Sequence, residues 1–174
     1  MKSLELNCSN VSDIQSLNQK NYDDNEKICV WNIHGLDQHK LRHDILGTFL
    51  SQHHIIMFNE TWSPNNEASE YELPGYELIN IPRSFKHKLA LRSSGGICLF
   101  VRKVLYKTGI EFHKNFEDLI VWIKLKKEYF GFKKDVFIAC VYIPPENSSQ
   151  TTSDAFGLLL DEITSLPKDS EVII

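Results

Sequence analysis

Three polar residues that could do chemistry stand at the ends of apolar runs in this sequence. Asn32 closes the run KICVWN, Glu60 closes HIIMFNE, and Tyr142 is the last residue but one of VFIACVYI. Their side chains supply an amide, a carboxylate and a phenol, groups that bind hard cations or hydrogen-bond phosphate. Each also has a structural alternative. Glu60 could cap the loop after its strand, Asn32 could form a turn before Gly35, and Tyr142 could belong to the core.

A strand–helix–strand unit is expected to bring Asn32 and Glu60 together. Residues 27–32 and 54–60 are short apolar runs typical of buried strands, and residues 37–52 between them predict an amphipathic helix. Such a crossover makes the two strands parallel. Their carboxyl ends therefore meet at one edge of the sheet, where open α/β sheets usually bind ligands. The helix is expected because Leu41, Ile45, Phe49 and Leu50 recur at helical spacing.

Further apolar runs predict strands at 95–101, 118–125 and 136–143, and a short last strand at 171–174. Residues 63–76 are rich in turn formers and predict a loop. The segment 136–143 ends at two prolines, which cannot donate to a strand ladder. We expect one mixed sheet with helices on one face.

A second crossover helix is predicted at 153–166, between the strands at 136–143 and 171–174. Ser153 is the expected N-cap, Asp154 lies in the first turn, and Pro167 follows the last residue. The expected buried stripe consists of Phe156, Leu159, Leu160, Ile163 and Leu166.

The histidine pair His39 and His43 does not form a zinc-protease motif. His39 and His43 have i, i+4 spacing, but Lys40 stands where the motif requires the glutamate base. Ser93 to Gly96 is too short for a phosphate-binding loop and predicts a tight turn into a strand.

The charge distribution says more than the net charge of −4. No acid occurs between Leu78 and Ile110, and a local basic stretch of this kind can face a polyanion such as DNA. A solvated loop and strand edge is the alternative. The basic residues are Arg83, Lys86, Lys88, Arg92, Arg102, Lys103 and Lys107.

The composition is that of one globular domain. The chain has 174 residues, of which 42% are hydrophobic and 24% charged. Its 4 cysteines form no C-x-x-C pair, which favours a reducing compartment. No apolar run is long enough to span a membrane, and no signal-peptide layout is found. Residues 1–26 are polar and are expected to be a disordered lead-in to a domain at 27–174.

Four motifs together resemble a known family. WNIHGL, FNETW, SSGGICLFVRK and VYIPPENSS, in this order and spacing, resemble the endonuclease/exonuclease/phosphatase superfamily. Within it, they are similar to the endonuclease domain of non-LTR retrotransposon polyproteins. The resemblance covers residues 27–174 and implies an α/β (α+β) fold, a mixed β-sheet with flanking helices that forms the first half of a four-layer β-sandwich nuclease.

The resemblance also implies roles for the three polar residues. Glu60 matches the glutamate that holds a Mg²⁺ (or Mn²⁺) ion, Asn32 the asparagine that supports metal and phosphate, and Tyr142 the tyrosine that hydrogen-bonds phosphate. The implied activity is metal-dependent nicking of DNA. The implied partners are DNA and a reverse transcriptase domain of the parent polyprotein, inside the cell and in the nucleus.

The sequence ends on SLPKDSEVII, which resembles the strand that precedes a Gly-Asp-Phe-Asn motif in that family. We therefore expect a domain truncated before the second half of its active site, which supplies mainly one of the two sheets and is inactive alone. Two alternatives stay open: a non-catalytic remnant with residual nucleic-acid binding, and a phosphatase or lipid phosphodiesterase of the same superfamily.

Overall fold

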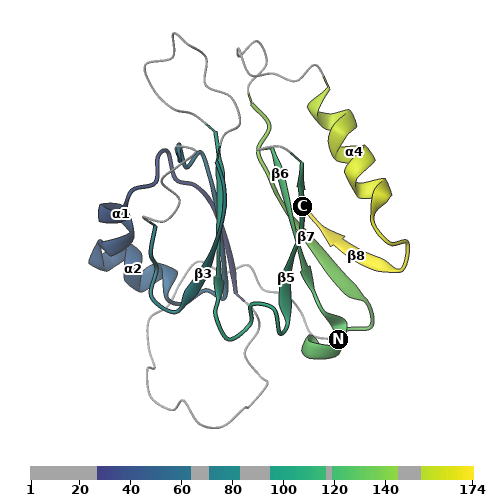
Figure 1. The fold of residues 1–174 in the computed structure, drawn as a ribbon, viewed down its shortest axis with the longest axis horizontal. Helices are drawn as coiled ribbons and strands as arrows, with labels where there is room; N and C mark the ends of the chain where they lie inside the picture. The colour runs from purple at the N-terminus through teal and green to yellow at the C-terminus, as the bar shows by residue number, and fades with distance from the viewer. Residues whose placement is uncertain (1–26, 64–70, 83–94, 117–118, 145–153) are drawn as a thin grey trace.

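The computed structural model describes residues 27–63, 71–82, 95–116, 119–144 and 154–174. Its strands form two four-stranded sheets, ordered β1-β2-β4-β3 and β5-β6-β7-β8. The sheets pack face to face, with α1 and α2 on the outer side of one and α4 on the outer side of the other (Figure 1). The elements are β1 (Ile28–Asn32), α1 (Gln38–Arg42), α2 (Asp44–Leu50), β2 (Ile55–Asn59), β3 (Tyr76–Ile81), β4 (Ile97–Arg102), β5 (Ile110–Phe116), β6 (Ile120–Leu125), α3 (Lys127–Phe130), β7 (Asp135–Val141), α4 (Ala155–Ser165) and β8 (Ser170–Ile173).

Both expected crossovers are confirmed. β1 pairs with β2 in parallel, and β7 pairs with β8 in parallel, whereas the other strand pairs are antiparallel. The expectations of a single sheet, and of a chain that supplies mainly one sheet, are wrong. β3 and β5 were not predicted as strands, and they complete one sheet each.

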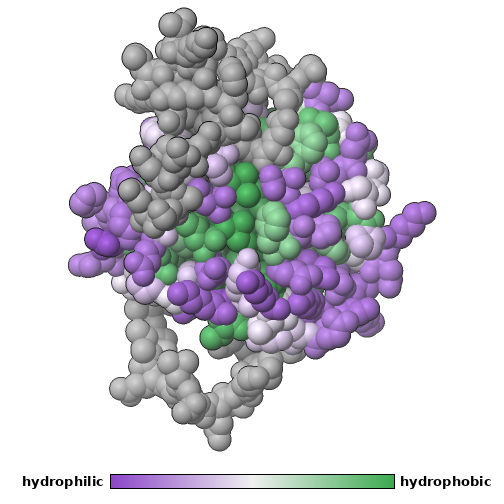
Figure 2. Space-filling view, in the orientation of Figure 1, coloured by the Kyte–Doolittle hydropathy of each residue, from purple (hydrophilic) through white to green (hydrophobic). Residues whose placement is uncertain are grey.

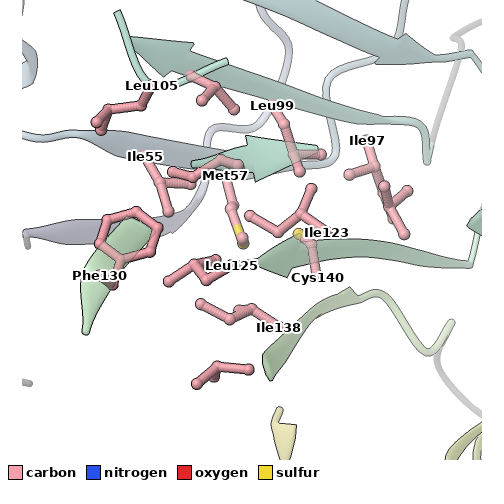
Figure 3. Packing of buried hydrophobic residues seen from close by; sticks show 14 residues of the cluster. Ile55, Met57, Ile97, Leu99, Leu105, Ile123, Leu125, Phe130, Ile138 and Cys140 are labelled. Atoms are coloured by element: carbon pink, nitrogen blue, oxygen red, sulfur yellow. The ribbon is translucent and has the colours of Figure 1, made fainter. Parts of the chain in front are cut away.

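The core between the sheets explains why two layers form. Side chains from β2 and β4 meet side chains from β6 and β7, and Phe130 of α3 closes one end (Figure 3). Separate apolar clusters lie under α1 and α2 and under α4. Strands that are apolar on both faces can be covered in this way, which produces four layers.

The predicted helix 37–52 is two helices. Asp37 caps α1 by accepting a hydrogen bond from the Lys40 N–H at 2.7 Å. His43 then takes an extended conformation, with φ −67° and ψ 123°, and separates α1 from α2. This break turns Ile45 outward, where it is 77% exposed, while Leu41 and Leu50 stay buried.

The helix α4 also differs from its predicted form. Its N-cap is Asp154, which accepts a hydrogen bond from the Gly157 N–H at 2.7 Å; the predicted cap, Ser153, lies outside the described residues. Of the expected stripe, Leu159, Ile163 and Leu166 pack on the sheet. The other two members point away from it: Phe156 is 74% and Leu160 is 60% exposed.

One side of the sandwich has apolar edges. β1 and β8 are edge strands on the same side, because β2 lies opposite β7. Val30 is in register with Met57, and Ile173 with Ile138, so both face the layer between the sheets. Val30 is 57% and Ile173 is 36% exposed. On the face that Figure 1 presents to the reader, Figure 2 shows hydrophobic residues in the middle, between hydrophilic ones.

Among the residues that the structure describes, no helix is long and apolar enough to cross a membrane.

Candidate functional site

Two loops leave the sheet edge where β1 and β2 end, and they are hydrogen-bonded to each other. Asn32 is in register with Asn59, and the Ile33 N–H donates to the Asn59 carbonyl at 3.0 Å. Further along, the Gly35 N–H donates to the Glu60 carbonyl at 2.7 Å. The parallel ladder therefore continues beyond the strands, and it places Asn32 and Glu60 at one edge, as the crossover predicted.

These loops concentrate unusual backbone conformations. Among the described non-glycine residues, a positive φ occurs at His34 (50°), Glu60 (56°), Trp62 (57°) and Lys107 (64°). Three of the four lie in the paired loops. A non-glycine residue in this region costs about 1–3 kcal/mol and persists where its surroundings enforce it, which is frequent at functional sites. The clustering of these conformations indicates a functional site at this edge.

The Glu60 carboxylate is held by two N–H donors. The Trp62 indole Nε1 donates to Oε2 at 2.7 Å, and the Gly95 backbone N–H donates to the same oxygen at 3.1 Å. Trp62 is joined to Gly95 a second time, because its own N–H donates to the Gly95 carbonyl at 2.9 Å. Hydrogen bonds to a carboxylate are among the stronger ones in proteins. Glu60 therefore ties its loop to the start of β4, as the capping alternative anticipated, and its charge is fixed in place.

The Asn32 loop is held from within by side chains. The Asn32 Oδ1 accepts the His34 N–H at 3.2 Å. The Lys40 ammonium, on α1, donates to the carbonyl oxygens of Ile33 at 3.2 Å, of His34 at 3.1 Å and of Gly35. Three carbonyls that face a cation fix the loop between β1 and α1. Asn32 and His34 remain exposed.

Asn59 joins this edge to the end of β7, which the third predicted residue, Tyr142, follows. The Asn59 Nδ2 donates to the Val141 carbonyl at 3.2 Å, and its Oδ1 accepts from the Cys140 thiol at 3.1 Å. Burial raises the pKa of Cys140 to about 12, so the thiol keeps the proton that it donates. Tyr142 follows directly, half-buried, with its N–H bonded to the Leu119 carbonyl at 2.7 Å. The end of β7 is thus joined to the end of β2, which precedes Glu60.

The predicted basic surface is divided. Arg83, Lys86, Lys88 and Arg92 lie outside the described residues. Arg102 ends β4, at the opposite end of the sheet from Glu60, since β4 runs antiparallel to β2. Its guanidinium donates to the carbonyl oxygens of Ser51 and His53 and lies 4.8 Å from the centre of the Tyr76 ring. Lys103 is its exposed neighbour. The structure does not bring Arg102 and Lys103 to the candidate site.

The donor set at this edge suits one kind of ion. Within the described ranges, no group of three or more His, Cys, Asp or Glu side chains could hold a metal. Zinc sites normally use three or four such ligands. Mg²⁺ is often held by one or two carboxylates and keeps several waters while substrate phosphate completes its shell. Glu60, at the sheet edge that also carries Asn32, fits that second pattern.

Reasoning from the sequence missed the residues that support the site. Asn59 and Trp62 flank Glu60 in the motif FNETW, and Gly95 opens the strand run at 95–101. A tryptophan in the loop after a strand was a usable signal, because a buried indole needs a hydrogen-bond acceptor. The partners of Asn59 could not be found in this way, since they lie on the other sheet.

Comparisons with known proteins agree with this architecture. No family model and no curated protein sequence matches the chain. The AP endonuclease LMAP from Leishmania major matches with a TM-score of 0.53 and 14% identity, over 70% of this chain and 41% of that one. A humanized D. rerio TDP2 matches with a TM-score of 0.51 and 15% identity, over 83% and 62%. D. rerio TDP2 complexed with a single-strand DNA product gives 0.50 and 12%, over 83% and 57%.

These likenesses concern the fold. The identities are low, and the matched region is between 41% and 62% of the solved structures, so the chain spans about half their length. The described part of this chain contains two mixed sheets flanked by helices. Over the matched part, the chain is similar in fold to these solved structures, which are of the endonuclease/exonuclease/phosphatase type.

Proposed function

We propose that this chain is part of a metal-dependent phosphodiesterase that acts on DNA, with its centre at Glu60. The observation that carries the proposal is the fixed carboxylate. Glu60 is held through Oε2 by Trp62 and Gly95 at a sheet edge that also carries Asn32, and the bond from Asn59 to the Val141 carbonyl joins this edge to the end of β7, which Tyr142 follows. A carboxylate fixed among amide and phenol donors suits a phosphate whose charge is shared with a cation.

The chain's own residues have distinct tasks in this proposal. Glu60 would hold Mg²⁺ or Mn²⁺, and Asn32 would support the ion or the phosphate beside it. The Tyr142 hydroxyl would donate a hydrogen bond to a phosphate oxygen. When bound, the ion would neutralise charge on the phosphate and stabilise the leaving oxygen. The left-handed loops and the Asn59 bridge hold these groups in place before substrate arrives, which limits reorganisation during the reaction.

The finer assignment rests on the motifs alone. Their resemblance to non-LTR retrotransposon endonucleases supports a nicking activity that serves reverse transcription, with a reverse transcriptase domain in the same polyprotein and a nuclear site of action. Of the solved neighbours, a TDP2 is complexed with single-strand DNA, which is consistent with DNA as the ligand.

The test measures binding and cleavage together. A labelled duplex, a single-stranded oligonucleotide and an inositol phosphate are titrated with the chain, with Mg²⁺ and with chelator, and a supercoiled plasmid is assayed for nicking. We expect Mg²⁺ to strengthen DNA binding at least about fivefold, within the usual range of coupling between ligands. The affinity should also fall steeply with salt, because neutralised phosphates release counterions.

Glu60→Gln is the matched control, since glutamine has the same shape and keeps an oxygen that can accept from Trp62 and Gly95. It should abolish the effect of Mg²⁺ and leave the melting curve close to that of the unmodified protein. Equal Mg²⁺ dependence in both proteins would refute the role of Glu60. Preference for the inositol phosphate over DNA would favour the lipid phosphodiesterase alternative.

A second candidate function is DNA binding without cleavage. It is favoured by the presence of a single carboxylate, Glu60, in the proposed donor set, with no cluster of three candidate ligands within the described ranges. Mg²⁺-dependent DNA binding by the 174-residue chain without plasmid nicking is the result that this candidate predicts.

A further inference from the structure

The indole of Trp62 has a specific relation to the proposed metal ligand. Its Nε1 lies 2.7 Å from Glu60 Oε2, and the Gly95 N–H reaches the same oxygen at 3.1 Å. We propose that Trp62 is a positioning residue that makes Glu60 a monodentate ligand and thereby favours Mg²⁺ over Ca²⁺. This inference rests on the proposed function, because it takes Glu60 as the residue that binds the ion.

The position of the indole is fixed by its surroundings. Gly35 has a φ of +85°, and a Cβ added there would lie 2.6 Å from Trp62 Cε3. The ring therefore lies directly on the Gly35 backbone, where no other residue type leaves room. The His34 ring packs against it edge to face, with centroids 4.4 Å apart. Lys40 in turn holds the carbonyls of His34 and Gly35.

The chemical consequence concerns the two carboxylate oxygens. Two N–H groups that converge on Oε2 occupy its lone pairs, so a cation is bound through the other oxygen. Mg²⁺ demands near-ideal octahedral geometry, and a single carboxylate oxygen meets that demand. Ca²⁺ has more ligands in a flexible shell and often takes both oxygens of one carboxylate. A carboxylate locked by Trp62 therefore discriminates against Ca²⁺.

Outer hydrogen bonds of this kind have a measurable effect on ligands. Their removal typically weakens metal binding by about 10- to 100-fold. Trp62→Phe keeps an aromatic ring against Gly35 and His34 and removes the N–H, while Gly95 still donates to the carboxylate. We therefore expect about tenfold weaker Mg²⁺ binding. Ca²⁺ affinity should fall less than Mg²⁺ affinity, because a carboxylate that can turn offers Ca²⁺ both oxygens.

The experiment combines calorimetry with a spectrum of the indole groups. The chain contains 3 tryptophans, so the indole N–H region of a ¹H–¹⁵N spectrum should show three signals, and Trp62→Phe identifies one of them. We expect this signal to move in Glu60→Gln and during titration with Mg²⁺. Mg²⁺ and Ca²⁺ affinities are measured by calorimetry for the unmodified chain, Trp62→Phe, Glu60→Gln and the matched control Trp31→Phe. Trp31 packs against Phe49, with centroids 6.2 Å apart, and is 43% exposed.

The outcomes separate this inference from the proposed function. The inference is supported if Trp62→Phe, and not Trp31→Phe, lowers the Mg²⁺ affinity and the ratio of Mg²⁺ to Ca²⁺ affinity. The melting curve of Trp62→Phe without metal should also match that of the unmodified chain. If Glu60→Gln abolishes binding and Trp62→Phe leaves both affinities unchanged, this inference is wrong and the proposed function stands. If the unmodified chain and Glu60→Gln bind Mg²⁺ alike, both are wrong. Should Trp62→Phe fail to fold, Gly35→Ala displaces the ring instead, and unchanged Mg²⁺ affinity in that variant would overturn the inference.

Discussion

Replacement of Asn59 by leucine should both destabilise the protein and weaken its metal-dependent DNA binding. Asn59 is half-buried and makes two hydrogen bonds to β7, a donated one to the Val141 carbonyl at 3.2 Å and an accepted one from the Cys140 thiol at 3.1 Å. Leucine has a similar volume and can make neither bond. The change therefore removes a polar link between the sheets without opening a large cavity.

The magnitude follows from those two bonds. Each is worth about 0.5–1.5 kcal/mol net, and the Val141 carbonyl loses a partner in a half-buried place, so we expect a loss of about 2–3 kcal/mol. Total stability of a domain is about 5–15 kcal/mol, so this is a substantial part of it. For a protein of this size, about 2–4 °C of melting temperature is lost per kcal/mol, which predicts a decrease of roughly 4–12 °C.

The assay is urea denaturation of the four proteins of a double-mutant cycle: the unmodified chain, Asn59→Leu, Cys140→Ala and the double variant. Because Asn59 and Cys140 share a bond, the double variant should be less destabilised than the sum of the single ones, by about 0.5–1 kcal/mol. Asn59→Leu should also reduce Mg²⁺-dependent DNA affinity, since it frees the end of β7, which carries Tyr142, from the end of β2. A loss of stability below about 0.5 kcal/mol, typical of surface substitutions, would refute the reasoning.

Three further results are expected. Burial raises the pKa of Cys98 and of Cys140 to about 12, so at pH 8 both should resist iodoacetamide until urea unfolds the chain; peptide mass spectrometry that finds either alkylated in the native protein would contradict this. Burial lowers the pKa of His53, so below about pH 6.5 the unfolded state binds a proton that the folded state does not. The free energy of unfolding should therefore decrease as the pH is lowered below about 6.5. His53→Gln should flatten that slope in urea melts, and an unchanged slope would rule His53 out as its source. The exposed apolar edge strand β8 should make copies of the chain associate with one another. Ile173→Lys should then reduce the molecular mass measured by light scattering, and a monomeric unmodified chain would contradict the expected association.

The strands that could be predicted are those whose apolar runs are continuous. β2, β4, β6 and β7 are buried along most of their length. β3 and β5 are edge strands in which polar residues such as Glu77 and Lys114 alternate with apolar ones, and they resemble surface loops in the sequence. Their strand conformation depends on the neighbour with which each pairs, which is a non-local condition.

The sequence by itself determined the two parallel crossovers, because strand and helix periodicities in this order allow little else, and it thereby placed Asn32 and Glu60 at one edge. The tertiary structure decided that the strands divide into two sheets. It also decided that the end of β7, which Tyr142 follows, is joined to the end of β2 by the bond from Asn59 to Val141, residues 82 positions apart. It placed the Trp62 indole on Gly35 and against the Glu60 carboxylate. The local sequence pattern predicts whether a side chain faces the core or the solvent. The residue that it contacts on the opposite sheet depends on how the whole core packs.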